Sequence, residues 1–517
     1  MSVVNNNLLL TADAATSAYQ ISRSLRFNSA DSAYANRTFG TPTTQGTFTL
    51  AMWVKRAALG TAQSLFGVST NHSFGFTTGN ALNLTFGGTS ALTTTAVFRD
   101  TSAWYHIVWT QSGTSHTVYV NGTSQGTATA TSSVFNTAVA HQVAASNTTN
   151  YFNGYLADVH FIDGQALTPS SFTETNATTG QLVPKAYTGT HGTNGFRLNF
   201  SDNSAATAAT LGADSSGNGN NWTPNNLSVT AGVGNDSLTD TPTSYGTNTG
   251  AGGEVRGNYA TLNPLDNTAT LSNGNLDVTW PSHSYASSYG TIAIPSTGSW
   301  YYECNVTSTP SAGDLWFGIS LSAGVGALFN TTASFVLYRY EPKKGIDNVY
   351  TAYGNAFTLG DVIGVAINVN GGQITFYKNG VSQGAISYSL TGKIMFPCFA
   401  LYAASASVNF GQRPFAYAAP SGFKALCDTN IPEGSITTSG TFTGNANANG
   451  PFVYLNGVPT AMTINSNAVT FATHVDKLAN GFKVRSSSGS YNTAGSNTYS
   501  ITTTGAKFKY ARAQANP

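Results

Sequence analysis

The sequence predicts an all-β protein with two antiparallel sandwiches and a small C-terminal β region. Apolar residues alternate with polar ones between Gly- and Asn-bearing turns, and 3.6-residue periodicity is almost absent. Two nine-residue stretches nearly repeat one another, Val118-Tyr-Val-Asn-Gly-Thr-Ser-Gln-Gly126 and Phe376-Tyr-Lys-Asn-Gly-Val-Ser-Gln-Gly384. Each predicts a hairpin, because Asn-Gly supplies the two left-handed residues of a type I′ turn. A shorter echo, Val453-Tyr-Leu-Asn-Gly457, lies near the C-terminus.

Composition favours large apolar cores beneath a polar but weakly charged surface. Charged residues make up 8% of the 517 residues, against about 25% in an ordinary soluble domain. Aromatic residues reach 12%, enough to exclude disorder. The net charge of +1 argues against nucleic-acid binding by the whole chain. After Gly434 the chain contains six basic residues and one acidic residue, Asp476. We interpret this tail as a solvated or subunit-contacting face, with an anionic partner as the alternative. The basic residues are Lys477, Lys483, Arg485, Lys507, Lys509 and Arg512.

The cysteines and the apolar runs predict where the chain is assembled. Cys304 and Cys398 lie in apolar strand patterns and are expected to be buried thiols. Together with Cys427 they form no CxxC pair and no even set for disulfides, so we expect the protein to be assembled in a reducing compartment. The N-terminus has no basic segment before its short apolar run, so we expect no signal peptide. No stretch approaches about 18 apolar residues, so we expect no membrane insertion.

Turn-rich stretches divide the chain into five parts. We predict an N-terminal segment over 1–21, a first sandwich over 22–182 and a Gly/Asn/Ser-rich connector over 183–257, with one strand near 195–200. A second sandwich is predicted over 258–433, and a small basic β domain over 434–517.

Each sandwich resembles a known family. In the first, Phe48-Thr-Leu-Ala-Met-Trp-Val-Lys55, Trp104-Tyr-His-Ile-Val-Trp109 and Phe152-Asn-Gly-Tyr-Leu-Ala-Asp-Val159 resemble the laminin-G/pentraxin-like branch of the concanavalin A-like, jelly-roll sandwiches. In the second, Trp300-Tyr-Tyr-Glu303, Trp316-Phe-Gly-Ile-Ser320, Gly360-Asp-Val-Ile-Gly364 and Ile374-Thr-Phe-Tyr-Lys-Asn-Gly380 resemble a SPRY domain. We therefore expect the similar Asn-Gly hairpins to reflect a sandwich architecture that the two domains share, since they do not by themselves indicate a recent duplication.

The whole arrangement resembles a family of bacteriophage virion proteins often labelled tail fibre. The stretches that carry this resemblance are Ser24-Leu-Arg-Phe-Asn-Ser-Ala-Asp-Ser-Ala-Tyr34, Asp214-Ser-Ser-Gly-Asn-Gly-Asn-Asn-Trp222, Asn409-Phe-Gly-Gln-Arg-Pro-Phe415, Gly422-Phe-Lys-Ala-Leu-Cys427 and Gly481-Phe-Lys-Val-Arg-Ser-Ser-Ser488. The resemblance implies a non-enzymatic structural protein of the virion, assembled in the host cytoplasm and attached through 1–21. It also implies a homotrimer that contacts other virion proteins and recognises a host-surface glycan or protein, with avidity from several copies.

Two alternatives remain open at this point. The first is a capsid-decorating or head-fibre protein without a receptor role, favoured by the lack of a coiled coil or shaft. The second is a carbohydrate-cleaving tailspike, since concanavalin A-like folds include glucanases. Their Glu-x-Asp-x-x-Glu motif is absent, and only Asp158 and His160 share a strand face that could support acid–base chemistry. We therefore predict no catalytic residues.

No cofactor or metal is predicted. The turn Asp214-Ser-Ser-Gly-Asn-Gly-Asn220 offers oxygen atoms but lacks the several carboxylates of a strong calcium site, so we interpret it as turn chemistry. His106 and His116 lie on adjacent predicted strands and could come close, but two ligands do not make a zinc site.

The predicted contact site is a loop-like stretch in the second sandwich. It combines charges and tyrosines, a mixture common in recognition surfaces and compatible with sugar stacking. A loop packed against a neighbouring subunit is an equal alternative. The residues assigned to ligand binding are Tyr338, Tyr340, Lys343, Lys344, Tyr350 and Tyr353.

Overall fold

The computed structural model describes most of the two sandwiches and parts of the C-terminal region. The described residues are 19–130, 134–175, 182–246, 254–308, 314–321, 334–390, 393–431, 434–444, 452–454, 459–469, 475–478, 481–484 and 495–506. The predicted attachment segment therefore lies almost wholly outside the described residues, as do the Asn456-Gly457 echo and Arg485, Lys507, Lys509 and Arg512 of the basic tail.

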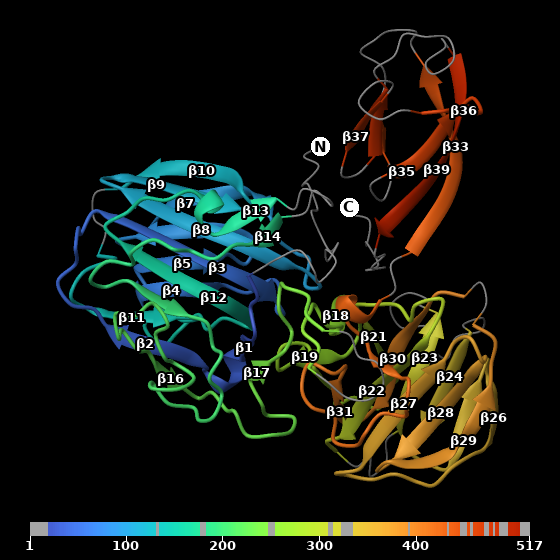
Figure 1. The fold of residues 1–517 in the computed structure, drawn as a ribbon. Helices are drawn as coiled ribbons and strands as arrows, with labels where there is room; N and C mark the ends of the chain where they lie inside the picture. The colour runs from blue at the N-terminus through green and yellow to red at the C-terminus, as the bar shows by residue number, and fades with distance from the viewer. Residues whose placement is uncertain are drawn as a thin grey trace.

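Two antiparallel sheets form the first sandwich, coloured blue to cyan in Figure 1. Its strands up to the connector are β1 (Ser24–Phe27), β2 (Tyr34–Thr38), β3 (Thr47–Arg56), β4 (Gln63–Ser69), β5 (His72–Phe76), β6 (Ala81–Phe86), β7 (Thr89–Val97), β8 (Trp104–Ser112), β9 (Ser115–Val120), β10 (Thr123–Thr129), β11 (Ala140–Val143) and β12 (Gly154–Asp163). One sheet contains the order β10-β9-β8-β3-β12-β1, and the other contains β2-β11-β4-β5-β6-β7.

The core of this sandwich follows from the period of two in its strands. On β8, Tyr105, Ile107 and Trp109 all enter the core between the sheets, because alternate residues of a strand point to one face. Trp109 is fully buried, and its ring lies 4.8 Å from Phe48 of β3 and 5.4 Å from Phe74 of β5. Since β3 and β5 belong to different sheets, this tryptophan joins the two layers.

The segment predicted as a connector contributes strands to both sheets of the first sandwich. Its elements are β14 (Leu182–Pro184), β15 (Phe196–Leu198), β16 (Thr223–Asn225) and β17 (Ser237–Leu238), and they follow β13 (Thr173–Thr175), which lies within the predicted first sandwich. β15 pairs with β12, β17 pairs with β1, and β16 pairs with β2 of the opposite sheet, while β13 and β14 form a separate ribbon. The chain thus wraps around the first sandwich before it reaches the second.

The second sandwich, yellow to orange in Figure 1, also consists of two antiparallel sheets. Its strands are β18 (Leu262–Asn267), β19 (Thr270–Ser272), β20 (Asp277–Trp280), β21 (Ala286–Gly290), β22 (Ser299–Val306), β23 (Asp314–Leu321), β24 (Phe335–Arg339), β25 (Lys343–Ile346), β26 (Val349–Ala352), β27 (Val362–Asn368), β28 (Gln373–Lys378), β29 (Val381–Ser387), β30 (Met395–Tyr402), β31 (Ala404–Asn409) and β32 (Lys424–Ala425). The sheet orders are β18-β21-β30-β23-β24-β25-β26 and β19-β20-β31-β22-β27-β28-β29, and β32 adds to β22 in parallel.

The C-terminal region forms two further antiparallel sheets, of orders β33-β39-β35-β36 and β34-β38-β37. Their strands are β33 (Gly434–Gly444), β34 (Phe452–Tyr454), β35 (Pro459–Ile464), β36 (Asn467–Ala468), β37 (Val475–Leu478), β38 (Gly481–Val484) and β39 (Gly495–Ala506). The described residues contain no α-helix and only three 3₁₀ turns, η1 (Ser29–Asp31), η2 (Pro169–Ser171) and η3 (Asp428–Asn430). This confirms the predicted all-β fold with two antiparallel sandwiches.

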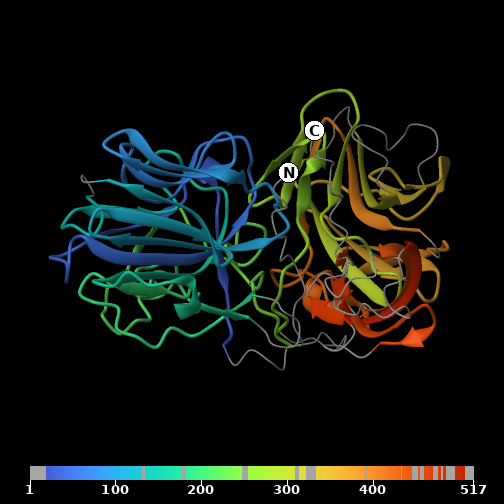
Figure 2. The same ribbon diagram turned by 90° about the horizontal axis from the view of Figure 1, so that it is seen from above.

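The two sandwiches lie side by side and meet through buried polar contacts (Figures 1 and 2). Tyr155 of β12 donates to the Gly274 carbonyl at 2.5 Å, and Asn275 donates to the Ala57 carbonyl at 3.0 Å. Lys55 of β3 forms a fully buried ion pair at 2.6 Å with Asp240, which follows β17. Burial of a polar group costs free energy unless the group forms a hydrogen bond or an ion pair, so these bonds determine how the two sandwiches pack together.

The three cysteines are buried and form no disulfide, in agreement with the expectation for Cys304 and Cys398. Among the described residues, no helix has the length and apolar character needed to cross a membrane.

Candidate functional site

The six residues predicted to bind a ligand lie on and beside strands, so the expectation of a loop is wrong. Tyr338 is on β24, the two lysines are on β25, and Tyr350 is on β26. Asp347 and Asn348 both have left-handed backbones, with φ of 46° and 70°, and they close a two-residue turn between β25 and β26. The charges and tyrosines that suggested a loop belong to the edge of a sheet.

Tyr338 is the fully buried member of this set, with its ring edge-on to Tyr353 at 5.3 Å. Its ring is fully buried against Phe357 at 5.2 Å and Phe376 at 5.4 Å, and its hydroxyl donates to the Asn355 carbonyl. Burial raises the pKa of Tyr338 to about 12. Tyr340 is half-buried and packs against the same core. Both tyrosines therefore stabilise the fold.

The remaining four residues form a small group at the sheet edge, in which Lys343 and Tyr350 are exposed and Lys344 and Tyr353 are half-buried. Lys344 Nζ lies 5.3 Å from the centre of the Tyr353 ring, and the Tyr353 hydroxyl donates to the Gly384 carbonyl at 2.6 Å. Lys343 Nζ lies 3.3 Å from Glu341, and Tyr350 is 45% exposed, with its ring 5.5 Å from Trp316. We call Lys343, Lys344, Tyr350 and Tyr353 the edge patch.

Asp158 and His160 come together, but Asp158 is already engaged by other side chains. A β-bulge in β12 gives Asp158 a left-handed backbone with φ of 49°. Its carboxylate accepts hydrogen bonds from Tyr19 at 2.5 Å and from Arg197 at 2.9 Å, and lies 3.3 Å from His160 Nε2. Burial alone would raise the pKa of Asp158, but His160 and Arg197 reverse this and hold it below its usual range. The arrangement resembles a structural ion cluster more than an acid–base pair.

The residues considered as metal ligands bind protein groups instead. His116 lies opposite Gln111 of β8 and accepts from Trp109 Nε1 at 3.3 Å, whereas His106 contacts Trp53 at 4.9 Å, so the two histidines are not brought together. Asp214 accepts hydrogen bonds from several groups of its own turn and neighbourhood: the amides of Arg197, Ser216 and Asn220 and the Ser216 hydroxyl. Across the described part of the chain, no three His, Cys, Asp or Glu side chains gather as a metal site requires.

A cavity between the two sandwiches is the candidate site that sequence reasoning missed. Its volume of about 590 Å³ lies within the range of about 300–1,000 Å³ typical of small-molecule sites, which often form at domain junctions. Its lining comes from the start of the first sandwich, the connector and the segment after β31: Arg23, Asn203, Asn235, Ser237, Thr239, Glu254, Val255, Tyr259, Gly411, Gln412, Arg413, Pro414, Phe415, Tyr417, Ala418, Ala419, Phe423 and Ala425.

One wall of the cavity is the segment 411–419, and two buried side chains hold its backbone. Asn409 accepts from the Gly411 amide at 3.0 Å and donates to the Pro414 carbonyl at 3.1 Å. Glu303 of β22 accepts from the amides of Ala416 at 2.7 Å and Tyr417 at 2.9 Å. Burial raises the pKa of Glu303 above its ordinary value. This wall is therefore preorganised by groups that do not face the cavity.

A glycine is required at the start of this wall. Gly411 has φ of 110°, and a Cβ atom there would lie 2.5 Å from the Cβ of Ala425. The stretch Asn409-Phe-Gly-Gln-Arg-Pro-Phe415, noted above only as part of a family resemblance, is the sequence signal that could have indicated this wall.

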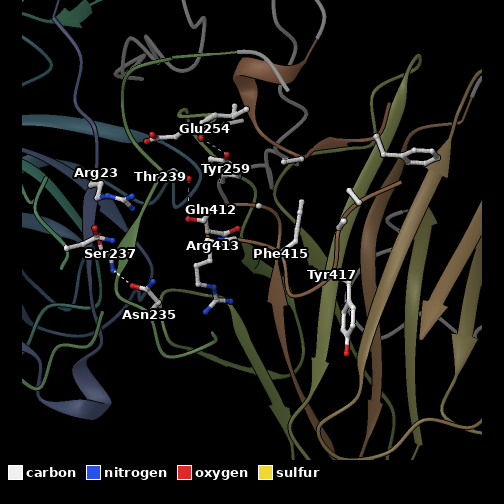
Figure 3. Close-up of a pocket in the computed structure, with 18 residues that line it drawn as sticks. Arg23, Asn235, Ser237, Thr239, Glu254, Tyr259, Gln412, Arg413, Phe415 and Tyr417 are labelled. Atoms are coloured by element: carbon white, nitrogen blue, oxygen red, sulfur yellow. Dashed lines mark hydrogen bonds between the residues drawn. The ribbon is translucent and has the colours of Figure 1, made fainter. Parts of the chain in front are cut away.

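The opposite wall belongs to the connector. Asn235 accepts from the Ser237 amide at 2.9 Å, and Thr239 donates through its amide to the Gln412 carbonyl at 3.1 Å, which joins the two walls. Glu254 pairs with Arg256 at 2.7 Å. Figure 3 shows Arg23 and Glu254 on one side, Phe415 and Tyr417 on the other, and Gln412 between them.

The lining combines amide and charged groups with aromatic rings. Phe415 packs edge-on against Tyr301 at 4.9 Å, and Tyr417 remains 37% exposed. Among the described residues that line the cavity, Glu254 is the only carboxylate, whereas glycoside hydrolysis ordinarily requires two. This chemistry suits binding of a polar molecule with an apolar face, such as a sugar ring.

Comparison with known proteins identifies both sandwich domains. Residues 28–171 match the Laminin_G_3 family model, described as the concanavalin A-like lectin/glucanases superfamily, and residues 299–413 match the SPRY domain model. The chain therefore contains a concanavalin A-like domain of the laminin-G type followed by a SPRY domain, as the sequence resemblance predicted.

Individual relatives are distant. The ATP-dependent RNA helicase Ddx1 of Drosophila melanogaster is 27% identical over 148 residues, which is 28% of this chain and 20% of the helicase. The chain thus spans only a fifth of that relative. The SPRY domain of human HERC1 is 18% identical, with a TM-score of 0.26, and the match covers 28% of this chain and 96% of that domain. A second human SPRY domain is 15% identical, with a TM-score of 0.23 and coverage of 27% and 94%.

Proposed function

We propose that this chain is a non-enzymatic recognition protein that binds a saccharide in the cavity between its two sandwiches. The observation that carries the proposal is the cavity itself, with a hydrogen-bonded wall, several amide and charged groups and four aromatic residues, of which Phe415 and Tyr417 lie on the 411–419 wall. Planar polar groups can bond sugar hydroxyls while an aromatic ring covers the apolar face of the sugar.

Two observations favour binding over cleavage. The cavity lining holds one carboxylate, Glu254, which is already paired with Arg256. Asp158, the acid considered in the sequence, is only 5% exposed and is held by Tyr19 and Arg197. Neither carboxylate has the partner needed to protonate a leaving group and activate water.

We further propose that the protein works on a bacteriophage particle, as a tail fibre or similar appendage that contacts the host surface. This setting is supported by the resemblance of stretches spread along the chain to phage virion proteins. A homotrimer would present three cavities, so that modest affinity for each saccharide becomes strong attachment.

Binding is tested with the purified chain on a glycan array, followed by calorimetric titration of the saccharides that bind. Tyr417→Ala should weaken binding about tenfold or more because it removes the exposed ring at the cavity. Tyr350→Ala is the matched control, since it removes an exposed tyrosine from the edge patch instead. Loss of binding in Tyr350→Ala alone would move the site to the edge patch, and absence of any saccharide binding would overturn the proposal.

The virion setting is tested by immunogold electron microscopy of particles whose genome encodes the chain. Label at the tail is expected. Label over the shell would favour a capsid-decorating protein, and particles without label would refute the virion assignment. Release of reducing ends from host polysaccharide would refute the non-enzymatic role.

A further inference from the structure

The guanidinium group of Arg23 lies at the cavity without an ion-pair partner among the described residues. Arg23 is half-buried just before β1, and it has no hydrogen-bond or ion-pair partner among the described residues. The nearby acid, Glu254, has its own partner in Arg256 at 2.7 Å. The hydrogen bond from Arg256 lowers the pKa of Glu254, with a smaller contribution from the charge of Arg23, so Glu254 stays ionised without pairing to Arg23.

A second cation adds positive potential to the same cavity. Arg413 is 3% exposed, and its guanidinium donates to the carbonyls of Val408, at 2.8 Å, and Val233. Burial lowers the pKa of Arg413 to about 10, which still leaves it charged at neutral pH. Both of these acceptors are neutral carbonyl oxygens, and the lining itself contains two arginines and one carboxylate, Glu254, which is paired with Arg256.

We infer that the ligand of this cavity is an acidic saccharide whose carboxylate pairs with Arg23. This inference rests on the proposed function and specifies its ligand class. A carboxylate matches the planar fork of a guanidinium through two parallel hydrogen bonds. The sugar ring then lies toward Phe415 and Tyr417, which Figure 3 places across the cavity from Arg23.

A neutral sugar fits this site less well for a physical reason. A ligand that fills the cavity removes water from Arg23, and a charge that loses water without gaining a counter-ion destabilises the complex. An anionic group on the ligand offsets this loss of hydration because it pairs with the guanidinium group. The carboxylate should therefore dominate selectivity, while the aromatic and amide groups supply binding common to charged and neutral sugars.

The test compares oligosaccharides of galacturonate, glucuronate and mannuronate with their methyl esters, which keep the sugar and remove the charge. Calorimetric titration of the full chain is expected to show at least one free acid binding about tenfold or more tightly than its ester. The difference should shrink as salt is raised, because counter-ions screen a half-exposed pair.

Arg23→Gln should abolish the preference for the acid over the ester, and Arg23→Lys should restore only part of it. Arg99→Gln is the matched control, because Arg99 is an exposed cation of the same sandwich outside the cavity lining. Arg23 precedes β1 and has no partner among the described residues, so the variants should melt at the temperature of the parent protein.

The outcomes separate this inference from the proposed function. Esters that bind as tightly as acids, with binding lost in Tyr417→Ala, would overturn the acidic specificity and leave saccharide recognition standing. An acid preference unchanged in Arg23→Gln would also overturn the inference. Failure of both acids and esters to bind, together with an array that is negative for neutral glycans, would overturn both.

Discussion

The ammonium group of Lys55 lies at the junction of the sandwiches with no exposed surface. It donates to Asp240 at 2.6 Å, to the Asn258 side chain at 2.7 Å and to the Tyr259 carbonyl at 2.9 Å. Trp104 Nε1 donates to the other oxygen of Asp240 at 3.1 Å. A buried charge is tolerated only when it is paired and fully hydrogen-bonded, so this cluster specifies which surfaces meet.

Replacement of Lys55 by methionine should destabilise the protein strongly. Methionine keeps the unbranched shape of the side chain up to Cε but leaves Asp240 buried without a cation, which costs about 3–5 kcal/mol. Urea unfolding measures the change. The double variant Lys55→Met/Asp240→Asn should recover part of the loss, and a loss below about 1 kcal/mol in the single variant would show that the pair does not hold the junction.

Glu303 is a positioning residue for the cavity wall. In Glu303→Gln one oxygen is replaced by an amide that donates, so the Ala416 or Tyr417 amide loses its acceptor. Hydrogen exchange of the 411–419 amides should rise about tenfold or more. Glu341→Gln, at a carboxylate that is 39% exposed in the same sandwich, is the control. Equal exchange in both variants would mean that the wall is held by Asn409 alone.

At the scale of elements, the two Asn-Gly hairpins make the same contacts in both sandwiches. Asn121 and Asn379 have φ of 48° in each case, followed by Gly122 at 79° and Gly380 at 77°. Each asparagine forms two hydrogen bonds of 2.8 Å with one residue of the strand before the hairpin: its side-chain oxygen accepts from the amide of that residue, and its own amide donates to the carbonyl of that residue. The residue is His106 of β8 for Asn121 and Val362 of β27 for Asn379. The short-range pattern alone predicted these turns because the dipeptide determines their backbone.

Alanine at the two hairpin glycines should have unequal effects. Both positions are left-handed, so each variant should lose about 1–2 kcal/mol from backbone strain. A Cβ at Gly122 meets open space, whereas one at Gly380 would lie 2.7 Å from the Tyr417 ring, at the cavity wall. Gly380→Ala should therefore lose about 1–3 kcal/mol more and bind saccharide less tightly. Equal unfolding free energies would contradict this packing.

The strands of the edge patch and the cavity could not be predicted from the sequence. The register of β24 to β26 depends on the Asp347-Asn348 turn, which is less distinctive than Asn-Gly, so the sequence pattern of tyrosines and lysines favours a loop there. The cavity joins Arg23, Glu254 and Phe415, and residues so far apart in sequence leave no periodic or local signal. Local chemistry predicts strands and turns, while a site between domains depends on how those domains dock.

At the scale of the whole molecule, burial shifts the pKa of four histidines in the first sandwich and of one glutamate in the second sandwich, in opposite directions. In the first, burial lowers the pKa of His106 to about 3 and the pKa of His116, His141 and His191 to about 4. In the second, burial raises the pKa of Glu303. The folded first sandwich therefore resists protonation of these four histidines, whereas the folded second sandwich holds a proton on Glu303 more readily than the unfolded chain does.

Acid should accordingly destabilise the first sandwich and spare the second. For the histidines, a folded pKa below the unfolded value of about 6.5 gives stability that is present above pH 6.5 and is lost as the pH falls toward about 4. Each pH unit of that difference costs on the order of 1 kcal/mol per histidine. For Glu303 the sign is opposite, because its raised pKa favours the folded state at low pH.

Hydrogen exchange at pH 7 and pH 4.5, corrected for the intrinsic effect of pH, tests this division. Protection should fall in the strands β3 to β12 and persist in β22 to β31. His141→Phe preserves the stacking on Phe39, which lies 3.8 Å from the His141 ring, and removes one proton acceptor. This variant should lose less protection on acidification than the parent protein. Equal loss in both sandwiches would show that the junction, and not the buried histidines, responds to acid.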